Sequence, residues 1–398
     1  MHSGAVRRRL TSFSHPTLSD FLTRTAVLPL LSDLVAIPSV NPSLAADGTG
    51  GEAQIAAFCR DWLNERGVRA WLEEAAPGRP NALAELGRGQ GRTLVLCAHL
   101  DTVPGTGMSN PFTAQVAGDR VLGRGAYDMK GGAAAIMCAA AALAETGLSG
   151  RVLLALVCDE EYASLGADDF VRRHRADGCI LTEPSDLELV VAHKGFVWLD
   201  LATRGVAVHG SRWQEGVSAI GRMARIVAEL ERFGADVLRR RGHPLLGPPS
   251  LHCATIEGGT GYSTYAAECT LRVERRTLPG ESPEQVLGEV EAAVRRAGEE
   301  AEVRITLERP PLVCDPEAEI VRAVRAAATS VTGEAPRETG VAYWMDAAVF
   351  AGAGIPAVDY GGTGGGAHSA EEWTDIDSWV STARVLVDAA RRFCGAGN

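Results

Sequence analysis

The chain has 398 residues with 50 acidic and 39 basic side chains, which gives a formal net charge of −11 at pH 7. Hydrophobic residues make up 46% of the sequence, enough for at least one large core, and the length is typical of about two to three domains. The acidic balance argues against a nucleic-acid groove, which needs a basic face, and the longest apolar run, Ala133 to Ala144, is too short to span a bilayer.

The first residues, MHSGAVRRRLTSFSHP, contain three consecutive arginines with no apolar segment after them, which argues against a secretory signal. Their Arg and Ser content also fits an organelle transit peptide, but we expect a solvated, disordered tail over residues 1–24. The nine cysteines form no CxxC pair, and several lie inside apolar runs. We therefore expect buried, reduced thiols in a cytoplasmic protein.

The next segments alternate between helical and strand patterns. Apolar residues recur at helical spacing from Asp20 to about Ile37, and a second helix is predicted over Glu52 to Arg66. An apolar strand, TLVLCAHLD, is followed by an Ala-rich helix from about Gly132 to Ala144 and by a second apolar strand, VLLALVCDEE. Continuous apolar strands separated by a helix are typical of a parallel sheet that is covered on both faces.

The middle third of the chain has a different pattern. From His193 to about Arg309 apolar residues alternate along the strands, and amphipathic helices are predicted near 217–233 and 282–297. This pattern indicates a smaller α+β module inserted into the first domain, whose α/β pattern then resumes and ends in a helix over Ile376 to Phe393. The predicted divisions are a catalytic domain in two parts, residues 25–192 and 310–398, and an inserted domain, residues 193–309.

Five short segments place metal-type ligands directly after strands or in turns. They are His99 in AHLD, Asp128 in GRGAYDMKGG, Glu160 and Glu161 in CDEEYASLG, Glu183 in LTEPS, and His368 in GGGAHSAEE. Each segment alone has an ordinary structural explanation, such as a surface histidine, a turn aspartate or solvated glutamates. Together they are harder to explain in this way, because acids that directly follow apolar strands need partners near a core.

These five segments, in this order, resemble the co-catalytic di-zinc aminoacylase and carboxypeptidase superfamily, which includes acetylornithine deacetylase and succinyl-diaminopimelate desuccinylase. The resemblance extends from about Thr25 to Arg392. It implies an α/β fold with a mixed, mostly parallel sheet flanked by helices, as in zinc exopeptidases, and an inserted α+β lid and dimerisation domain.

The resemblance also implies a ligand set for two Zn²⁺ ions. His99 and Glu183 would bind one zinc, Glu161 and His368 would bind the other, and Asp128 would bridge the two. Imidazole and carboxylate ligands suit Zn²⁺, and Co²⁺ or Mn²⁺ could substitute for it.

The implied mechanism uses a water held between the two metals, with Glu160 as the general base that takes its proton. Asp101 would hold the second imidazole nitrogen of His99 and so fix the tautomer of that ring. The peptide bond between Asp128 and Met129 would be cis.

Three further positions are implied to act on the substrate. His209, in GVAVHGSRW, would reach the active site of the partner subunit in a homodimer and stabilise the oxyanion, although by itself it would be an ordinary edge-strand residue. Arg309, in ERPPL, would either bind the substrate carboxylate or form a salt bridge at the hinge between the domains. Gly364 belongs to the run Gly361 to Gly366, which we expect to form a substrate-facing loop rather than a plain connector.

The expected function is a metal-dependent hydrolase that cleaves the amide bond of an N-acyl amino acid, of the acetylornithine deacetylase or succinyl-diaminopimelate desuccinylase type. A carboxypeptidase or dipeptidase of the same superfamily is the alternative. Either enzyme would act on small molecules or short peptides, without nucleic-acid or membrane partners. A non-catalytic binding scaffold should lack a ligand or the base, and this sequence contains all of them.

Overall fold

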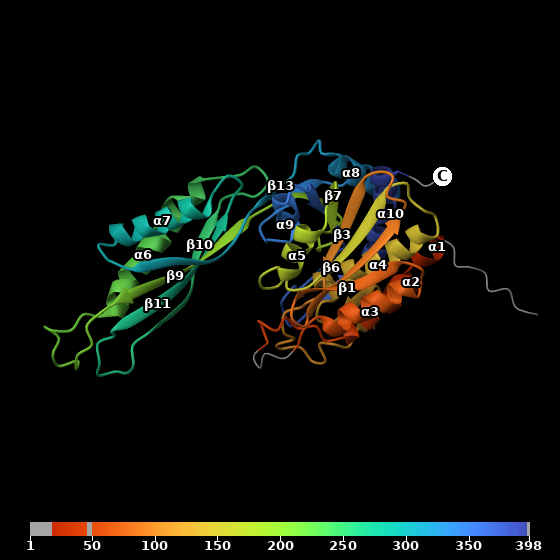
Figure 1. Ribbon diagram of the computed structural model, residues 1–398. Coiled ribbons are helices and arrows are strands. Elements are labelled where there is room, and N and C mark those ends of the chain that lie inside the picture. The colour runs from red at the N-terminus through yellow and green to blue at the C-terminus, as the bar shows by residue number, and fades with distance from the viewer. Residues whose placement is uncertain (1–17, 46–49, 396–398) are drawn as a thin grey trace, which may run out of the picture.

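The computed structural model describes residues 18–45 and 50–395, which form two lobes (Figure 1). The larger lobe contains a nine-stranded mixed sheet between helices, and the smaller lobe contains a four-stranded antiparallel sheet. Strand β9 (Gly195–Arg204) leads into the smaller lobe and strand β12 (Glu302–Arg309) leads back. The predicted α/β class with an additional α+β unit is therefore confirmed.

In spatial order the large sheet consists of β1 (Arg69–Ala76), β2 (Arg79–Gly87), β6 (Arg151–Val157), β3 (Thr93–His99), β7 (Gly178–Leu181), β15 (Ala357–Asp359), β8 (Leu189–His193) and β13 (Leu312–Val313), with β14 (Glu338–Val341) beside β8. The four central strands, from β6 to β15, pair in parallel. The outer pairs on both sides are antiparallel, apart from the parallel pairing of β14 with β8. Parallel pairing therefore predominates only at the centre of this mixed sheet.

The central strands bury both of their faces, as their continuous apolar sequence predicts. In β3, for example, Leu94 and Leu96 belong to one core cluster, whereas Val95 and Cys97 belong to the other. The helices that contribute to the first cluster are α2 (Arg24–Ala36), α3 (Ala53–Asn64), α4 (Gly131–Ala144), α8 (Glu319–Thr332) and α10 (Ile376–Cys394). Those that contribute to the second cluster are α5 (Leu165–Arg173) and α9 (Ala347–Gly352).

Helix α4 is almost completely buried because its residues are mostly alanine and glycine. A Cβ atom at Gly131 would lie 2.4 Å from the ring of Trp379 in α10, so the first turn of α4 requires a residue without a side chain. Directly before α4, the Lys130 ammonium donates to the carbonyls of Leu34 and Ile37 at the end of α2. The segment that directly follows Asp128 is therefore fixed against both α2 and α10.

Part of the predicted tail, residues 18–24, lies in the described structure. Residues 1–17 lie outside the described part of the chain, but Leu18–Phe21 form the short helix α1, and Leu22 is 8% exposed. The predicted tail boundary at residue 24 is too late, because the apolar side chain of Leu22 already packs into the core.

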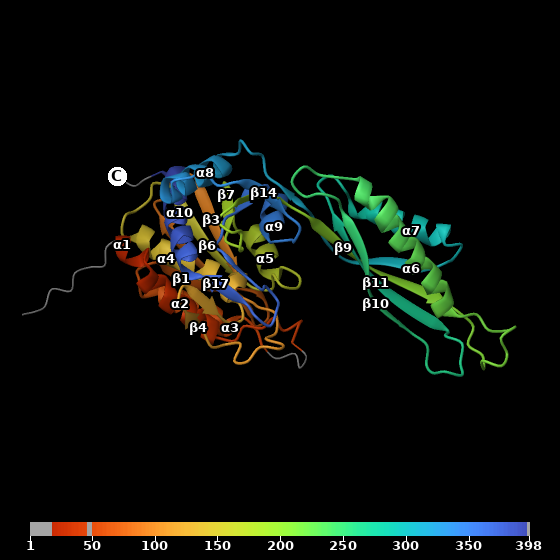
Figure 2. The same ribbon diagram turned by 180° about the vertical axis from the view of Figure 1, so that it is seen from behind.

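In the smaller lobe, helices α6 (Ala219–Asp236) and α7 (Pro283–Arg296) share one core with the sheet, in the order β10 (Ser250–Gly258), β11 (Glu268–Thr277), β9 and β12 (Figure 2). Both helices start at a serine whose hydroxyl accepts a backbone N–H in the first turn, from Gly221 in α6 and from Gln285 in α7. None of the described helices is long and apolar enough to cross a membrane.

A third, small sheet lies in the larger lobe. Its strands are β16 (Gly364–Gly365), β17 (Trp373–Asp375), β5 (Arg120–Leu122) and β4 (Gln115–Ala117). Through the pairing of β17 with β5, this sheet brings the loop that contains His368 to the turn that contains Asp128.

Candidate metal centre

The carboxyl ends of three neighbouring parallel strands supply four of the predicted site residues. His99 is the last residue of β3, Glu160 and Glu161 follow β6, and Glu183 follows β7. Because these strands run in the same direction, their ends meet at one edge of the sheet, where open α/β sheets bind ligands.

The two remaining predicted ligands come from the segments that the small sheet connects. The Nε2 atom of His99 lies 3.1 Å from Oδ1 of Asp128, and the Nε2 atom of His368 lies 3.3 Å from Oδ2 of the same carboxylate. Asp128 thus stands between the two imidazoles, and its peptide bond to Met129 is cis, as predicted.

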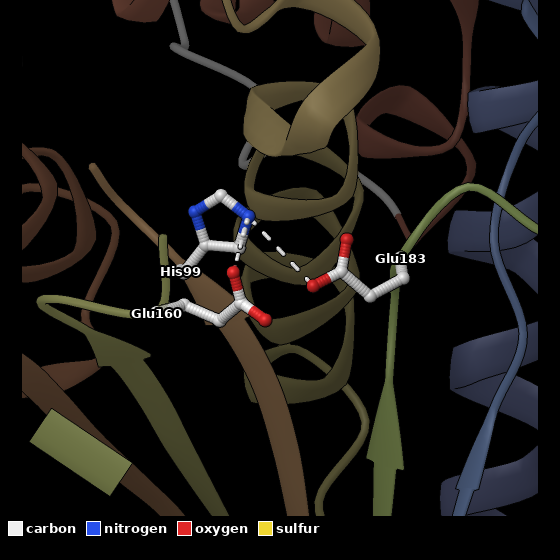
Figure 3. A group of neighbouring side chains, drawn as sticks. All are labelled: His99, Glu160 and Glu183. Carbon is white, nitrogen blue, oxygen red and sulfur yellow. Dashed lines mark ion pairs between the residues drawn. The ribbon is translucent and has the colours of Figure 1, made fainter. Parts of the chain in front are cut away.

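The glutamates complete two groups of donor atoms around Asp128. His368 Nε2 lies 2.9 Å from Oε2 of Glu161, and His99 Nε2 lies 3.7 Å from Oε1 of Glu183. Glu160 points toward the same imidazole, with its Oε2 3.9 Å from His99 Nε2 (Figure 3). The structure therefore brings together all five predicted metal ligands and the predicted base.

Among the described residues that line the cavity, no lysine or arginine balances the negative charges of this cluster. Burial raises the pKa values of Glu160, Glu161 and Glu183, and the neighbouring carboxylates raise them further. Hydrogen bonds to Asp128 and Glu161 raise the pKa of His368 to about 10. The carboxylates of Asp128 and Glu161 therefore favour a positive charge at the position of this imidazole.

The pKa of the Asp128 carboxyl is shifted in the opposite direction, to a lower value. Its burial favours the neutral acid, but hydrogen bonds to His368 and then to His99 outweigh burial and lower the pKa of the carboxyl. A carboxylate that stays ionised between two imidazoles is suited to bridge two cations.

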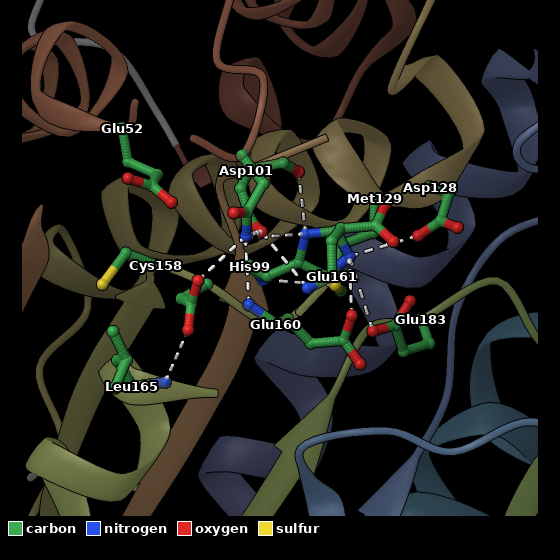
Figure 4. Close-up of polar contacts among 12 residues, drawn as sticks. Glu52, His99, Asp101, Asp128, Met129, Cys158, Glu160, Glu161, Leu165 and Glu183 are labelled. Carbon is green, nitrogen blue, oxygen red and sulfur yellow. Dashed lines mark hydrogen bonds and ion pairs between the residues drawn. The ribbon is translucent and has the colours of Figure 1, made fainter. Parts of the chain in front are cut away.

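Asp101 differs in one respect from its predicted role. The His99 Nδ1 atom lies 2.9 Å from the backbone carbonyl oxygen of Asp101, whereas the Asp101 carboxylate lies 3.6 Å from it. That carboxylate instead accepts hydrogen bonds from the backbone N–H groups of Glu160 and Glu161, at 3.1 and 3.2 Å (Figure 4). Asp101 therefore fixes the imidazole through its main chain and the two glutamates through its side chain.

A buried polar network supports Asp101 from behind. The Asn41 amide donates to Asp101 Oδ2 at 2.7 Å and to Asp159 Oδ1 at 3.0 Å, and Arg79 also pairs with Asp159 at 2.9 Å. Asp159 has a left-handed backbone (φ 71°), which is uncommon for a residue with a side chain. The network thus holds the tight turn from which Glu160 and Glu161 extend.

The cluster opens into a cavity of about 450 Å³. Besides Asp128, His368 and the three glutamates, the described residues that line the cavity are Tyr127, Pro184, Tyr343, Trp344, Gly365, Gly366 and Ala367. The Tyr343 hydroxyl donates to the carbonyl of Pro184 at 2.8 Å, and the Trp344 indole donates to that of Pro310 at 3.0 Å. Trp344 therefore forms part of the cavity wall and is fixed there by its hydrogen bond to Pro310.

Arg309 does not line this cavity. Its guanidinium contacts the carbonyl of Ala163 and pairs with the Asp168 carboxylate at 3.1 Å. Because Arg309 ends β12 and Asp168 lies in α5, the pair connects the two lobes. These contacts fit the hinge salt bridge, which is one of the two alternatives expected for Arg309.

Gly364 itself is not among the described residues that line the cavity, although Gly365 and Gly366 of the same glycine run line it. A Cβ atom at Gly364 would lie 2.4 Å from the carbonyl oxygen of Trp373 and 2.5 Å from Cδ2 of Tyr127. The absence of a side chain at this position lets Tyr127 pack beside the hairpin, so Gly364 supports the cavity wall without lining it.

His209 lies in the smaller lobe and is not among the described residues around the cavity. It is exposed, and its Nδ1 atom lies 2.8 Å from the Ser211 hydroxyl. The loop that follows β9 lies at the end of the smaller lobe that points away from the larger lobe (Figures 1 and 2). Within one chain, this arrangement keeps His209 away from the predicted metal ligands.

The donor set fits a metal cofactor. Imidazole nitrogens and carboxylate oxygens from different strands converge at one cavity, and none of the described residues that line it is a lysine or arginine. The donor atoms of His99, Asp128 and Glu161 all lie within 4.8 Å of one another, as do those of His99, Glu160 and Glu183. Such mixed nitrogen and oxygen sites are typical of divalent transition metals.

Comparison with known proteins agrees with this geometry. Residues 95–392 match the model of peptidase family M20/M25/M40. The chain belongs to this family. It is therefore a metal-dependent amidohydrolase of the M20 type.

Curated relatives of this M20 chain include acetylornithine deacetylases. The protein from Vibrio cholerae is 32% identical over 260 residues, which cover 64% of this chain and 68% of the relative. The protein from Photorhabdus laumondii is 26% identical over 386 residues, or 93% of this chain and 98% of the relative.

Solved structures share the fold of this M20 chain. The M20 family metallo-carboxypeptidase Sso-CP2 from Sulfolobus solfataricus has a TM-score of 0.77 at 20% identity, with 92% of this chain and 99% of that chain covered. A dinuclear metal-binding M20 peptidase from Bacillus subtilis has a TM-score of 0.70 at 17% identity, with coverages of 94% and 98%.

Proposed function

We propose that this M20 hydrolase is a deacylase that cleaves the amide bond of N-acyl amino acids and releases a carboxylate and a free amine. The observation that carries the proposal is the convergence of His99, Asp128, Glu161, Glu183 and His368 beside Glu160 at one cavity. The acetylornithine deacetylase relatives support a substrate with an N-acyl group.

The proposed ligand assignment follows the two groups of contacts. His99 and Glu183 would hold one cation, Glu161 and His368 would hold the other, and Asp128 would contact both. Two Zn²⁺ ions, or Co²⁺ or Mn²⁺ in their place, would polarise the scissile carbonyl and lower the pKa of water in the cavity.

Glu160 is the proposed proton carrier. Its backbone N–H is fixed by Asp101, and its carboxylate points into the cavity next to His99 (Figure 4). From this position it would accept a proton from the attacking water and deliver that proton to the nitrogen of the leaving amine.

The smaller lobe, residues 193–309, is proposed to act as lid and dimerisation domain. Because His209 is remote from the cavity of its own chain, it would serve the cavity of a partner subunit in a homodimer, where it would donate a hydrogen bond to the oxyanion.

A substrate panel tests the proposal. Purified protein is loaded with Zn²⁺ or Co²⁺ and assayed against N-acetyl, N-succinyl and N-formyl amino acids and against dipeptides. We expect amine release from N-acyl amino acids, its loss after treatment with a chelator, and its return when metal is added. Hydrolysis of dipeptides alone would instead favour the peptidase alternative, and activity that is insensitive to chelation would contradict the proposed mechanism.

A further inference from the structure

Glu372 and Arg124 form a buried ion pair between the two segments that carry Asp128 and His368. Arg124 follows β5 in GRGAYD, and Glu372 precedes β17 in AHSAEE. The side chains are 2% and 1% exposed, and Nη1 of Arg124 lies 2.5 Å from Oε2 of Glu372. A buried ion pair often adds little to stability, because both charges lose their hydration. The role of this pair is therefore inferred from the other hydrogen bonds that the two side chains form.

The Glu372 carboxylate accepts four hydrogen bonds from the Asp128 turn. Oε2 accepts from Arg124 and from the backbone N–H of Gly125 at 3.0 Å, and Oε1 accepts from the N–H groups of Tyr127 and Asp128 at 3.0 and 3.1 Å. The last bond comes from the main chain of the proposed bridging ligand. Glu372 therefore fixes the backbone from which the Asp128 carboxylate extends.

Arg124 connects the Asp128 turn to the loop that contains His368. Its Nη2 atom donates to the carbonyl of Ser369 at 2.9 Å, one residue after His368, and its Nε atom donates to the carbonyl of Pro104 at 3.2 Å. His368 itself has a left-handed backbone (φ 61°), a conformation that persists only where the surroundings hold it. The hydrogen bond from the Arg124 guanidinium to the carbonyl of Ser369 supplies such a contact one residue after His368.

We propose that Glu372 and Arg124 are positioning residues for the metal centre. Neither residue lines the cavity among the described residues, so both act through Asp128 and His368, whose ligand atoms lie 3.3 Å apart. The pair sets this separation and thereby the affinity for the cation that the two ligands share with Glu161. This inference rests on the proposed function, because it requires a metal at these residues.

Two conservative substitutions separate positioning from mere stabilisation. Glu372→Gln keeps one carbonyl oxygen but turns an NH₂ group toward two donors, from Arg124 and Gly125. Arg124→Lys keeps the positive charge but loses the planar guanidinium group, whose separate nitrogens donate to both Glu372 and Ser369. The matched control is Glu281→Gln, which removes the negative charge from a largely buried pair with Arg275 (2.7 Å) in the smaller lobe.

The test measures zinc affinity by titration against a competing chelator, with bound zinc counted by atomic emission and thermal unfolding of the metal-free proteins followed in parallel. We expect Glu372→Gln and Arg124→Lys to bind zinc about 10- to 100-fold more weakly at one of two sites. Their activity should return in excess zinc with an unchanged KM. Glu281→Gln should lose thermal stability but retain wild-type zinc affinity.

Wild-type zinc affinity in both Glu372→Gln and Arg124→Lys, or an equal loss in Glu281→Gln, would overturn the inference while leaving the proposed function intact. Wild-type protein that binds no zinc would overturn both. If Glu372→Gln does not fold, Arg124→Lys decides the outcome against the same control.

Discussion

At the scale of single residues, the site depends on buried polar residues that each form hydrogen bonds to several neighbouring site residues. Asp101 contacts His99 through its carbonyl and both Glu160 and Glu161 through its carboxylate. Because the bonds made by the carboxylate end on backbone N–H groups, they orient the glutamates without consuming their side chains. The glutamate carboxylates thus remain available for metal and substrate.

His193 gives a prediction about pH and stability. It is fully buried at the end of β8, its Nδ1 atom donates to the carbonyl of Lys194 at 2.9 Å, and burial lowers its pKa from 6.5 to about 4. As the pH falls from 6.5 to 4, the unfolded chain takes up a proton on this residue before the folded chain does. Stability that is present above pH 6.5 is therefore lost toward pH 4, by up to about 3 kcal/mol.

Urea unfolding of the metal-free wild type and of His193→Gln at pH 7, 5.5 and 4.5 measures this contribution. The amide of glutamine can still donate a hydrogen bond but does not titrate. We expect the free energy of unfolding to fall more steeply with decreasing pH in the wild type than in the variant. Parallel pH dependences would contradict this account of His193.

At the scale of elements, the β16–β17 hairpin positions one wall of the cavity. Gly364→Ala would place a methyl group against the Trp373 carbonyl and the Tyr127 ring, and neither can yield without moving the chain next to Asp128. Because small displacements at an active site are costly, we expect kcat to fall by about 10- to 100-fold.

The control for Gly364→Ala is Gly261→Ala, where no atom lies within 4 Å of the added methyl group and φ is not left-handed. Steady-state kinetics on the best N-acyl substrate of the panel would show normal kcat for the control. An unchanged kcat in Gly364→Ala would show that the hairpin tolerates the methyl group and does not set the cavity wall.

The sequence predicts those elements whose pattern reflects burial. The apolar strands before His99 and Glu160, the Ala-rich helix and the helix Ile376–Cys394 follow directly from periodicity. The antiparallel strands β1 and β2 were not predicted, because RAWLEEAA and RPNALAELG mix polar and apolar residues without a clear alternation.

The proposed ligands could be predicted because they lie in short sequence motifs. The hydrogen bonds that support these ligands could not be predicted. The segments around His99, Asp128 and His368 predicted ligands that the structure brings together. The contacts of Arg309 with Asp168 and of Gly364 with its neighbours are tertiary, so the sequence left the role of Arg309 open and gave no sign of the close packing at Gly364. Glu372 lay in a quoted motif, but its four hydrogen bonds join residues almost 250 positions apart, which no local spacing encodes.

At the scale of the whole molecule, the two lobes separate His209 from the predicted metal ligands of the same chain (Figure 1). This separation predicts that two inactive variants complement each other if His209 acts across a dimer. A Glu160→Gln chain would supply His209 to the intact cavity of a His209→Ala chain. After subunit exchange, half of the dimers would be mixed and each would contain one complete site, giving about a quarter of wild-type activity.

Mixing the two purified variants, with each alone as control and light scattering to measure the oligomeric state, tests this prediction. Restored activity would support a contribution from the partner subunit. A mixture no more active than the separate proteins, in spite of demonstrated subunit exchange, would contradict it.

The central claim is that Glu160 moves the proton at a metal centre formed by the neighbouring side chains. Glu160→Gln tests it most directly, because glutamine preserves the shape and the backbone contacts with Asp101 but cannot accept the proton. We predict that this variant retains wild-type amounts of bound metal and loses at least about 100-fold in kcat toward N-acyl amino acids. A Glu160→Gln protein with full metal content and wild-type turnover would contradict the account.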